Sequence, residues 1–300
     1  INLVPRDTGP ATLTTSINSN YNPTTGTFDL RDVVPGAYWL RAQAAEYTTS
    51  ALIPANAVGR TVSEALTMAT GLRTAAQISL DVTGNVDGLV LSMTSGVSVP
   101  GSLRVEGQPL PATPAPRVTL RSTSTSGFSS PLQPINADGT FTLLNVFPGE
   151  YRVMVTPMPP DYYIKEARNE QVDVLNQPWV IGNAIRGNLE VVLSSAAGQI
   201  EGTVIDARSQ PVVSLQTILL PDQDRGRIEL VKTVVTDQNG HFNFRGVSPG
   251  NYKIFAWEGL EANAFYDPEV MRQYEQQGKA VRVTEGAKIT SEVRMIPAKQ

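Results

Sequence analysis

The sequence contains no cysteine and a single histidine, His241. Without cysteine, the chain cannot form a disulfide framework, a thiolate metal site or a cysteine nucleophile. Hydrolytic zinc sites use two histidines and a carboxylate, and a Ser-His-Asp triad would have to use His241. The sequence also lacks a Gly-x-Ser-x-Gly nucleophile motif. We therefore expect a protein that is not an enzyme, with no catalytic residues, no metal and no cofactor.

Charged residues are also scarce. They make up 17% of the chain, against roughly 25% in typical soluble domains. The net charge is −4 and lysine and arginine do not cluster, which argues against a nucleic-acid partner because phosphate binding needs a basic face. The sequence has no run of 18 apolar residues, so no membrane span is expected in this segment. It begins with Ile1 rather than methionine, which is compatible with the removal of a targeting segment.

One motif occurs three times with the same internal spacing. It consists of Gly-x-Phe, followed seven residues after the phenylalanine by Pro-Gly-x-Tyr. The copies are Gly26–Tyr38, Gly139–Tyr151 and Gly240–Tyr252. The first glycine follows turn-forming residues and is expected to supply a positive φ. Alternating apolar residues then predict two strands, and Pro-Gly predicts a type II turn between them. Each copy should therefore form a β-hairpin with one buried face.

Other strands surround this motif. Val99–Leu103 and Ile200–Val204 alternate around a central glycine, and each precedes a proline-containing loop and a further strand. Closing strands are expected at Leu89–Met93, Leu189–Leu193 and Ile289–Ile296. The count is about seven strands per copy. We expect three β-sandwich modules at 1–95, 96–195 and 196–300, which we call the first, middle and third repeat. Their linkers are short, which predicts a semi-rigid rod.

Two short helices are also expected. Asp267-Pro268 is typical of a helix start, which predicts a helix near 267–277. A second helix is expected at Val62–Thr70.

The repeated residues resemble the carboxypeptidase regulatory-like domain, a seven-stranded sandwich similar to transthyretin. The positions that carry the resemblance are Gly202, Val204, Gly240, Phe242, Pro249, Gly250 and Tyr252, with counterparts in the middle repeat. The resemblance implies an all-β protein of tandem seven-stranded antiparallel β-sandwich (transthyretin-like/Ig-like) domains. It implies little about function, because such modules are appended to peptidases, outer-membrane receptors and surface proteins alike. The C-terminal sequence is similar to large secreted proteins of environmental bacteria.

Aromatic residues gather near the C-terminus. Trp257, Tyr266 and Tyr274 are candidate ligand-binding residues, because exposed tryptophan and tyrosine rings stack on sugars. The competing interpretation is that they bury one another in a small satellite core. Carboxylates also occur in the turns before Gly139 and Gly240 and between Glu258 and Glu269, but turn formation accounts for those in the turns without calcium.

The first repeat is short at its start. In the other repeats, 38 positions separate the glycine of the Gly-centred strand (Gly101, Gly202) from the first glycine of the motif. Only 25 residues precede Gly26, and Ile1–Leu3 aligns with Val118–Leu120. The Gly-centred strand therefore has no counterpart, which predicts an open sheet edge and a slot in the core. Either a longer chain supplies that strand, or another chain does.

These features predict a non-enzymatic scaffold that is extracellular or on a bacterial cell surface. It would act through contacts with copies of itself or with other surface proteins, and a head-to-tail filament is one form of such an assembly. The alternative is a carbohydrate-binding accessory module of a larger secreted protein. That alternative requires a coplanar pair of aromatic rings on an exposed face.

Overall fold

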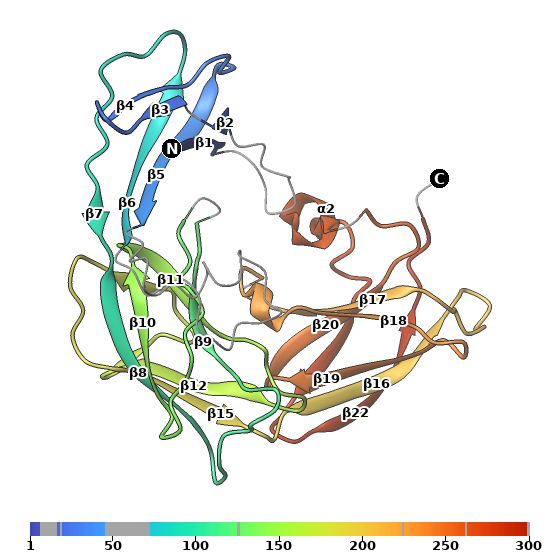
Figure 1. Ribbon diagram of the computed structural model, residues 1–300. Coiled ribbons are helices and arrows are strands. Elements are labelled where there is room, and N and C mark those ends of the chain that lie inside the picture. Colours follow the sequence, from blue (N-terminus) through green and yellow to red (C-terminus); the bar gives the residue numbers. More distant parts are fainter. Residues whose placement is uncertain are drawn as a thin grey trace, which may run out of the picture. The chain divides into compact units, whose positions relative to one another are not determined.

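The protein is all-β, because 49% of the residues that the structure describes lie in strands and 4% lie in helices (Figure 1). The computed structural model describes residues 1–6, 17–18, 20–45, 73–124, 127–223, 225–261 and 263–298. The helix expected at Val62–Thr70 lies outside these residues. The chain divides into two compact units. One comprises Ile1–Leu103, Arg117–Thr156 and Ala167–Glu190, and the other Arg104–Pro116, Pro157–Glu166 and Val191–Gln300. The division into three modules remains a prediction.

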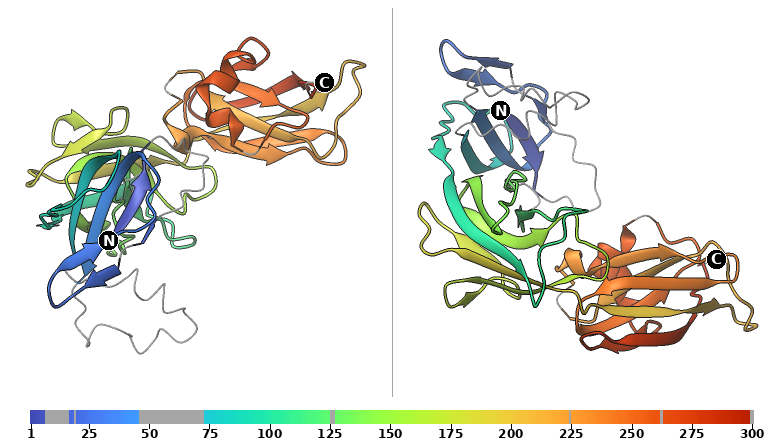
Figure 2. Two further views of the ribbon diagram at one scale, coloured as in Figure 1. Left: turned by 90° about the horizontal axis from the view of Figure 1, so that it is seen from above. Right: turned by 60° about the horizontal axis from the view of Figure 1, so that its bottom comes forward.

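The first repeat contains one large sheet and one small one. The large sheet has the order β2-β1-β5-β6-β7. Its strands are β1 (Asn2–Pro5), β2 (Ile17–Asn18), β5 (Gly36–Ala45), β6 (Arg73–Val82) and β7 (Thr94–Ser95). Strands β5 and β6 pair along all ten of their residues (Figures 1 and 2). The small sheet is a hairpin of β3 (Asn20–Asn22) and β4 (Thr27–Asp29).

The middle repeat has two sheets, of orders β10-β8-β15-β12-β13 and β14-β11-β9. The strands of the first are β8 (Val97–Val105), β10 (Thr140–Val146), β12 (Tyr163–Asn169), β13 (Val172–Asp173) and β15 (Leu189–Ser194). Those of the second are β9 (Val118–Ser122), β11 (Gly149–Val155) and β14 (Trp179–Ile181).

The third repeat shows the sandwich most fully. Its sheets have the orders β19-β16-β22 and β18-β17-β20-β21. The strands are β16 (Gly198–Ile205), β17 (Gln216–Pro221), β18 (Lys232–Val235), β19 (His241–Val247), β20 (Gly250–Ala256), β21 (Lys279–Val283) and β22 (Lys288–Arg294). Strand β16 is antiparallel to β19 and parallel to β22. Buried residues of both sheets, such as Phe242 and Ile254, form one core.

Short helices occur only in the third repeat among the described residues. They are η2 (Ile228–Leu230), η3 (Ala264–Tyr266) and α2 (Pro268–Arg272). The predicted start of α2 is confirmed, because Asp267 is the N-cap and its Oδ1 accepts a 2.8 Å hydrogen bond from the Glu269 N–H. The helix is shorter than the predicted range of 267–277.

The hairpin predicted from the repeated motif is wrong. In the middle repeat, β10 pairs with β8, whereas β11 pairs with β9 and β14 in the other sheet. In the third repeat, β19 and β20 are divided between the two sheets in the same way. Both strands of the motif carry buried apolar residues, so they lie on opposite sides of the core. The motif is a crossover from one sheet to the other.

The backbone bends at a residue that sequence reasoning missed. Asp32, Asn145 and Gly246 each stand three positions before the proline of the motif, and each has a positive φ, between 57° and 64°. In the middle and third repeats the strand register shifts next to this position. Asparagine, aspartate and glycine tolerate left-handed backbone better than other residues. The presence of such residues at one position of the motif in all three copies could have predicted this bend from the sequence.

The two glycines of the motif have different roles. The first glycine is Gly26, Gly139 or Gly240, and its predicted positive φ is confirmed at 71°, 85° and 74°. The second is Gly36, Gly149 or Gly250, and its φ is not positive, so the predicted type II turn, which requires a positive φ there, is wrong. Instead, the ring of the following tyrosine lies over it. A Cβ atom would stand 3.3 Å, 3.5 Å and 3.2 Å from that ring, respectively.

That tyrosine also fixes the crossover. Its hydroxyl donates a hydrogen bond to the carbonyl oxygen four residues earlier in every repeat. The pairs are Tyr38 to Val34 at 2.7 Å, Tyr151 to Phe147 at 2.7 Å and Tyr252 to Ser248 at 2.9 Å. The bond closes the Pro-Gly corner and satisfies the buried phenol, as in the tyrosine corners of other β-sandwiches.

Candidate functional site

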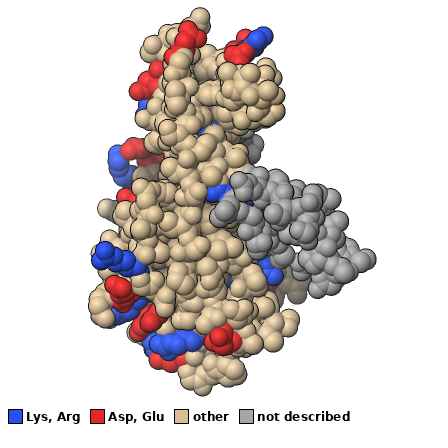
Figure 3. Space-filling view, turned by 60° about the vertical axis from the view of Figure 1, so that its left-hand side comes forward, with Lys and Arg blue, Asp and Glu red and all other residues tan. Residues whose placement is uncertain are grey.

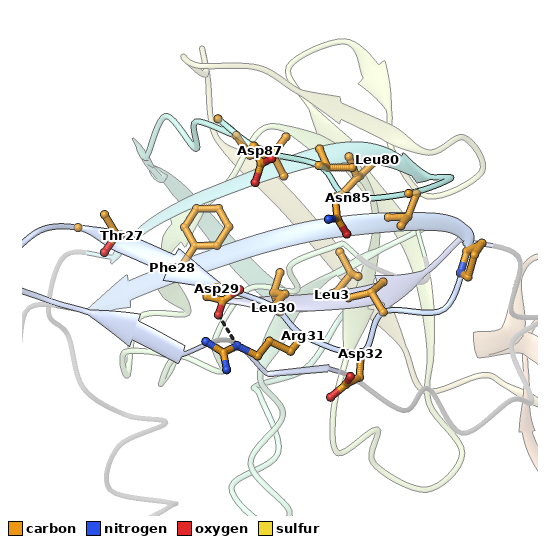
Figure 4. A pocket seen from close by; sticks show the side chains of 18 residues that line it. Leu3, Thr27, Phe28, Asp29, Leu30, Arg31, Asp32, Leu80, Asn85 and Asp87 are labelled. Carbon is orange, nitrogen blue, oxygen red and sulfur yellow. Dashed lines mark hydrogen bonds and ion pairs between the residues drawn. The ribbon is translucent and has the colours of Figure 1, made fainter.

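The first repeat contains a cavity of about 840 Å³ between two stretches of chain. One wall is Gly26–Val33, which begins with β4, and the other is Gly84–Leu89. Leu3 and Leu80 of the large sheet also line it. Figure 4 shows Leu3, Leu30, Leu80 and Phe28 grouped around this space. We call it the first-repeat groove.

The groove lies where the other repeats have their Gly-centred strand. Strand β1 occupies the position of β9 and β17, because each pairs with the strand that follows the Pro-Gly corner. In each pair a leucine lies opposite the residue two positions after the tyrosine of the motif. The pairs are Leu3 with Leu40, Leu120 with Val153 and Leu219 with Ile254. The predicted alignment of Ile1–Leu3 with Val118–Leu120 is thereby confirmed.

One wall of the groove contains β4. Its counterparts in the other repeats, β10 and β19, pair with the Gly-centred strands β8 and β16. In the other repeats, Gly101 lies opposite Phe141 and Gly202 opposite Phe242. Phe28 is the corresponding phenylalanine, and its strand β4 pairs only with β3 among the described residues. The other edge of β4 therefore faces the groove.

The inward-facing side chains of this wall are incompletely covered. Phe141 and Phe242 are 4% and 3% exposed, whereas Phe28 is only half-buried. Two residues further along, Leu143 and Phe244 are fully buried while Leu30 is half-buried. Side chains at these two positions of the motif are thus buried in the middle and third repeats and only partly buried in the first.

The opposite wall of the groove is also less complete than its counterpart in the middle repeat. The closing strand expected at Leu89–Met93 is not formed, because residues 83–93 have no strand pairing. Leu89 and Leu91 are half-buried and Val90 is 79% exposed. In the middle repeat the corresponding strand β15 lies beside β8 and is almost fully buried. A strand needs a hydrogen-bonding neighbour, and the described residues of the first repeat provide no such neighbour.

The rim of the groove is polar. Arg31 Nε lies 2.6 Å from Asp29 Oδ2, and this hydrogen bond raises the pKa of Arg31. Asp32 and Asp87 also lie at the rim (Figure 4). The groove thus has an apolar floor, one wall that begins with β4, a second wall without strand pairing, and a charged rim. The face drawn in Figure 3 has scattered acidic and basic side chains rather than a basic surface.

The aromatic candidates form a satellite core. Trp257 is 5% exposed and stacks on Phe255, with ring centroids 4.9 Å apart and an interplanar angle of 5°. Tyr274 meets the Trp257 ring edge-on at 5.8 Å. Tyr266 packs partly buried against the same cluster, which includes Met271 of α2. These rings cover one another instead of forming an exposed platform, so the carbohydrate alternative gains no support.

His241 and the turn carboxylates have local structural roles. His241 is exposed in β19, and its backbone N–H donates a 2.8 Å hydrogen bond to Asp237 Oδ1. Asp138 accepts hydrogen bonds from the Thr140 side chain and backbone. These bonds lower the pKa of both aspartates. Within the described ranges, no three His, Cys, Asp or Glu side chains could hold a metal ion. No described helix could span a membrane.

Comparison with known families identifies the type of domain in the third repeat. Residues 199–295 match the carboxypeptidase regulatory-like domain. The predicted resemblance is confirmed there. No curated protein matches the chain.

Among solved structures, three β-sandwich proteins of bacteria illustrate the matches. The Bacillus anthracis TIE protein is 13% identical with a TM-score of 0.24; the match covers 98% of this chain and 51% of that one. A streptococcal ancillary pilin is 11% identical with a TM-score of 0.26, covering 94% and 81%. BcpA, the major pilin subunit of Bacillus cereus, is 10% identical with a TM-score of 0.24, covering 66% and 98%. The chain spans about half the length of the B. anthracis protein.

Proposed function

We propose that this chain is a non-enzymatic structural protein of a bacterial cell surface that works through contacts with other proteins. The observation that carries the proposal is the open core of the first repeat. Half-buried residues such as Phe28 and Leu30 line a groove beside a strand edge. Unpaired edges and exposed apolar grooves are sites where other polypeptides bind.

A structural role agrees with the chemistry of the side chains. The chain has one histidine and no cysteine, and His241 stands on an exposed strand beside a turn aspartate. The candidate aromatics Trp257 and Tyr274 pack on each other. What remains exposed and incomplete is a sheet edge, which is suited to binding a protein.

The placement at the cell surface rests on the regulatory-like sandwich at 199–295 and on the similarity of the C-terminal sequence to secreted bacterial proteins. Antibody labelling of intact cells, followed by fractionation, tests it. We expect the protein on the surface of unbroken cells. Recovery only from the cytoplasmic fraction would contradict the proposal.

Head-to-tail assembly is the form of this proposal in which the partner is another copy. Negative-stain electron microscopy of the native protein tests this form. Filaments whose subunits meet through the first repeat would support it. Isolated particles at all protein concentrations would contradict head-to-tail assembly. The proposed contacts with other surface proteins would not be affected by that result.

A further inference from the structure

In two repeats, the left-handed bend that precedes the Pro-Gly corner lies against the repeat before it in the chain. We propose that this bend is a docking element, which fixes the middle repeat to the first and the third repeat to the middle one. The partner that the bend fits is the start of a strand in another β-sandwich repeat. Each of the two contacts lies inside one compact unit, the first contact in one unit and the second in the other. The inference does not depend on the proposed function.

The contact between the first and middle repeats centres on Arg73, the first residue of β6. The backbone N–H of Arg73 donates a 2.9 Å hydrogen bond to Oδ1 of Asn145, the bend residue of the middle repeat. The carbonyl oxygen of Arg73 accepts a 3.4 Å hydrogen bond from the N–H of Gly96, the residue before β8. Asn145 is buried at this contact. The middle repeat therefore holds one residue of the first repeat through both of its backbone polar groups.

The linker between these two repeats passes directly over the bend. Strand β7 ends at Ser95 in the large sheet of the first repeat, and β8 begins at Val97 in the middle repeat. Gly96 is the only residue between them. A Cβ atom at Gly96 would stand 2.6 Å from the Cα atom of Asn145, so a side chain there would push the linker away from the bend. The linker and the bend thus form one closely packed contact.

The contact between the middle and third repeats has the same arrangement and a different chemistry. Here Asp161, two residues before β12, is the residue that is held twice. Its carbonyl oxygen accepts a 3.3 Å hydrogen bond from the N–H of Ala197, which corresponds to Gly96 because each directly precedes the strand residue paired with the valine after the bend. The carboxylate of Asp161 pairs with the guanidinium of Arg245, at N···O distances of 3.0 Å and 2.5 Å. Arg245 is the neighbour of the bend residue Gly246.

The identity of each bend residue fits what the bend contacts. A Cβ atom at Gly246 would stand 3.4 Å from the carbonyl oxygen of Tyr162, so the bend of the third repeat approaches the middle repeat with its backbone. Asn145 instead reaches the first repeat with its side-chain amide. Asp32, the bend residue of the first repeat, is exposed. It provides a control position at which the same bend carries no such contact among the described residues.

The two contacts should respond differently to salt. Arg245 and Asp161 are 57% and 45% exposed, and a second pair between the same repeats, Lys165 with Glu285, is also accessible to solvent. Exposed ion pairs are weak and are screened by salt, with a Debye length of roughly 3 Å at 1 M. The bond at Asn145 joins a backbone N–H to a neutral amide. Salt should therefore loosen the contact of the third repeat and leave that of the middle repeat unchanged.

The test uses the 300-residue chain, whose lack of cysteine allows two spin labels to be attached at chosen positions. Pulsed electron paramagnetic resonance then measures the distribution of distances between the labels. Ser79→Cys on β6 and Val180→Cys on β14 report on the first and middle repeats. Arg104→Cys on β8 and Val235→Cys on β18 report on the middle and third repeats. All four positions are exposed, and we expect a single narrow distribution for each pair at low salt.

Asn145→Gly tests the first contact, because glycine keeps the left-handed bend and removes only the side-chain amide. We expect the distribution between positions 79 and 180 to broaden by about twofold or more, as for repeats that move independently. Asp32→Gly is the matched control and should leave the distribution narrow. Asn145→Asp should also leave it narrow, because a carboxylate still accepts the bond from Arg73. Chemical denaturation checks that each variant remains folded.

Arg245→Gln tests the second contact. We expect the distribution between positions 104 and 235 to broaden by about twofold or more. Arg294→Gln, at an exposed position of β22, is the matched control and should have no effect. Raising the salt concentration to 1 M should broaden the same distribution without any further substitution and leave that between 79 and 180 narrow. The salt measurement therefore tests the second contact even if the Arg245→Gln variant folds poorly.

Three outcomes would overturn the proposal. Broad distributions without further substitution at low salt would mean that the bends do not fix the repeats. Narrow distributions in both Asn145→Gly and Arg245→Gln, with no effect of salt, would mean that other contacts hold the repeats. Broadening by Asp32→Gly equal to that by Asn145→Gly would mean that the effect comes from the change of bend residue and not from the lost contact.

Discussion

Gly101 lies directly opposite Phe141 in the middle repeat, with no room for a side chain between them. Gly101→Val should therefore destabilise the middle repeat by about 3 kcal/mol, because the new atoms would overlap the phenylalanine ring and a backbone carbonyl. Gly182→Ala is the matched control, since a Cβ atom there meets nothing within 4 Å. Chemical denaturation measures both variants. Equal stability of the two would contradict the close packing.

Gly246 occupies the left-handed bend that precedes the Pro-Gly corner of the third repeat, with φ at 64°. Gly246→Val should cost about 2 kcal/mol of stability, because a β-branched residue resists positive φ. Gly246→Asn should cost much less, since Asn145 adopts φ of 58° at the same position in the middle repeat. Thermal unfolding of both variants tests the prediction. A valine variant as stable as the asparagine variant would show that the bend does not depend on this residue.

The corner tyrosines should make the protein sensitive to alkali. Burial raises the pKa of Tyr151 and of Tyr252 to about 12, whereas tyrosine in an unfolded chain ionises near pH 10. The folded state holds these protons more tightly, so their contribution to stability is complete below about pH 10. It is lost as the pH rises to about 12.

Phenylalanine substitutions test this pH dependence. Tyr151→Phe should remove part of the loss of stability above pH 10. It should also cost about 1 kcal/mol at neutral pH, because the Phe147 carbonyl loses its donor. Tyr21→Phe, at a 53% exposed position, is the control. Chemical denaturation from pH 8 to 12 measures the stability of both variants. If Tyr151→Phe lost as much stability above pH 10 as the unmodified protein, the prediction would be wrong.

The three phenylalanines of the motif should differ in their contribution to stability. Phe141→Ala or Phe242→Ala should destabilise its own repeat by about 3–5 kcal/mol, because each removes a fully buried ring. Phe28→Ala should cost no more than about 1–2 kcal/mol, because its side chain is less fully buried than those of Phe141 and Phe242. Hydrogen exchange in the strands of each repeat reports these losses separately. A loss at Phe28 as large as at Phe141 would mean that its ring is covered.

The sequence was sufficient to place the repeated residues and the gap in the first repeat. The spacing of Gly-x-Phe and Pro-Gly-x-Tyr is local, so it identifies the residues that enter the core, such as Phe242 and Tyr252. The shortage of residues before Gly26 correctly indicated that a Gly-centred strand has no counterpart among the described residues.

The pairing of strands could not be obtained in that way. Alternation shows that β10 and β11 each have a buried face, but it does not show whether the two pair with each other or face each other across a core. Their partners β8 and β9 lie earlier in the sequence. Likewise, Leu89–Met93 has the composition of a strand and forms none, because a strand depends on a neighbour that sequence alone does not supply.

The first repeat has an open core where the other repeats are closed. Amide hydrogen exchange of the 300-residue chain tests it most directly, by comparing residues 27–33 with their counterparts 140–146 and 241–247. We expect exchange at 27–33 to be faster by about tenfold or more, because no described strand covers those amides on the side of the groove, whereas β8 and β16 pair with their counterparts. Equal protection of the three segments would contradict it.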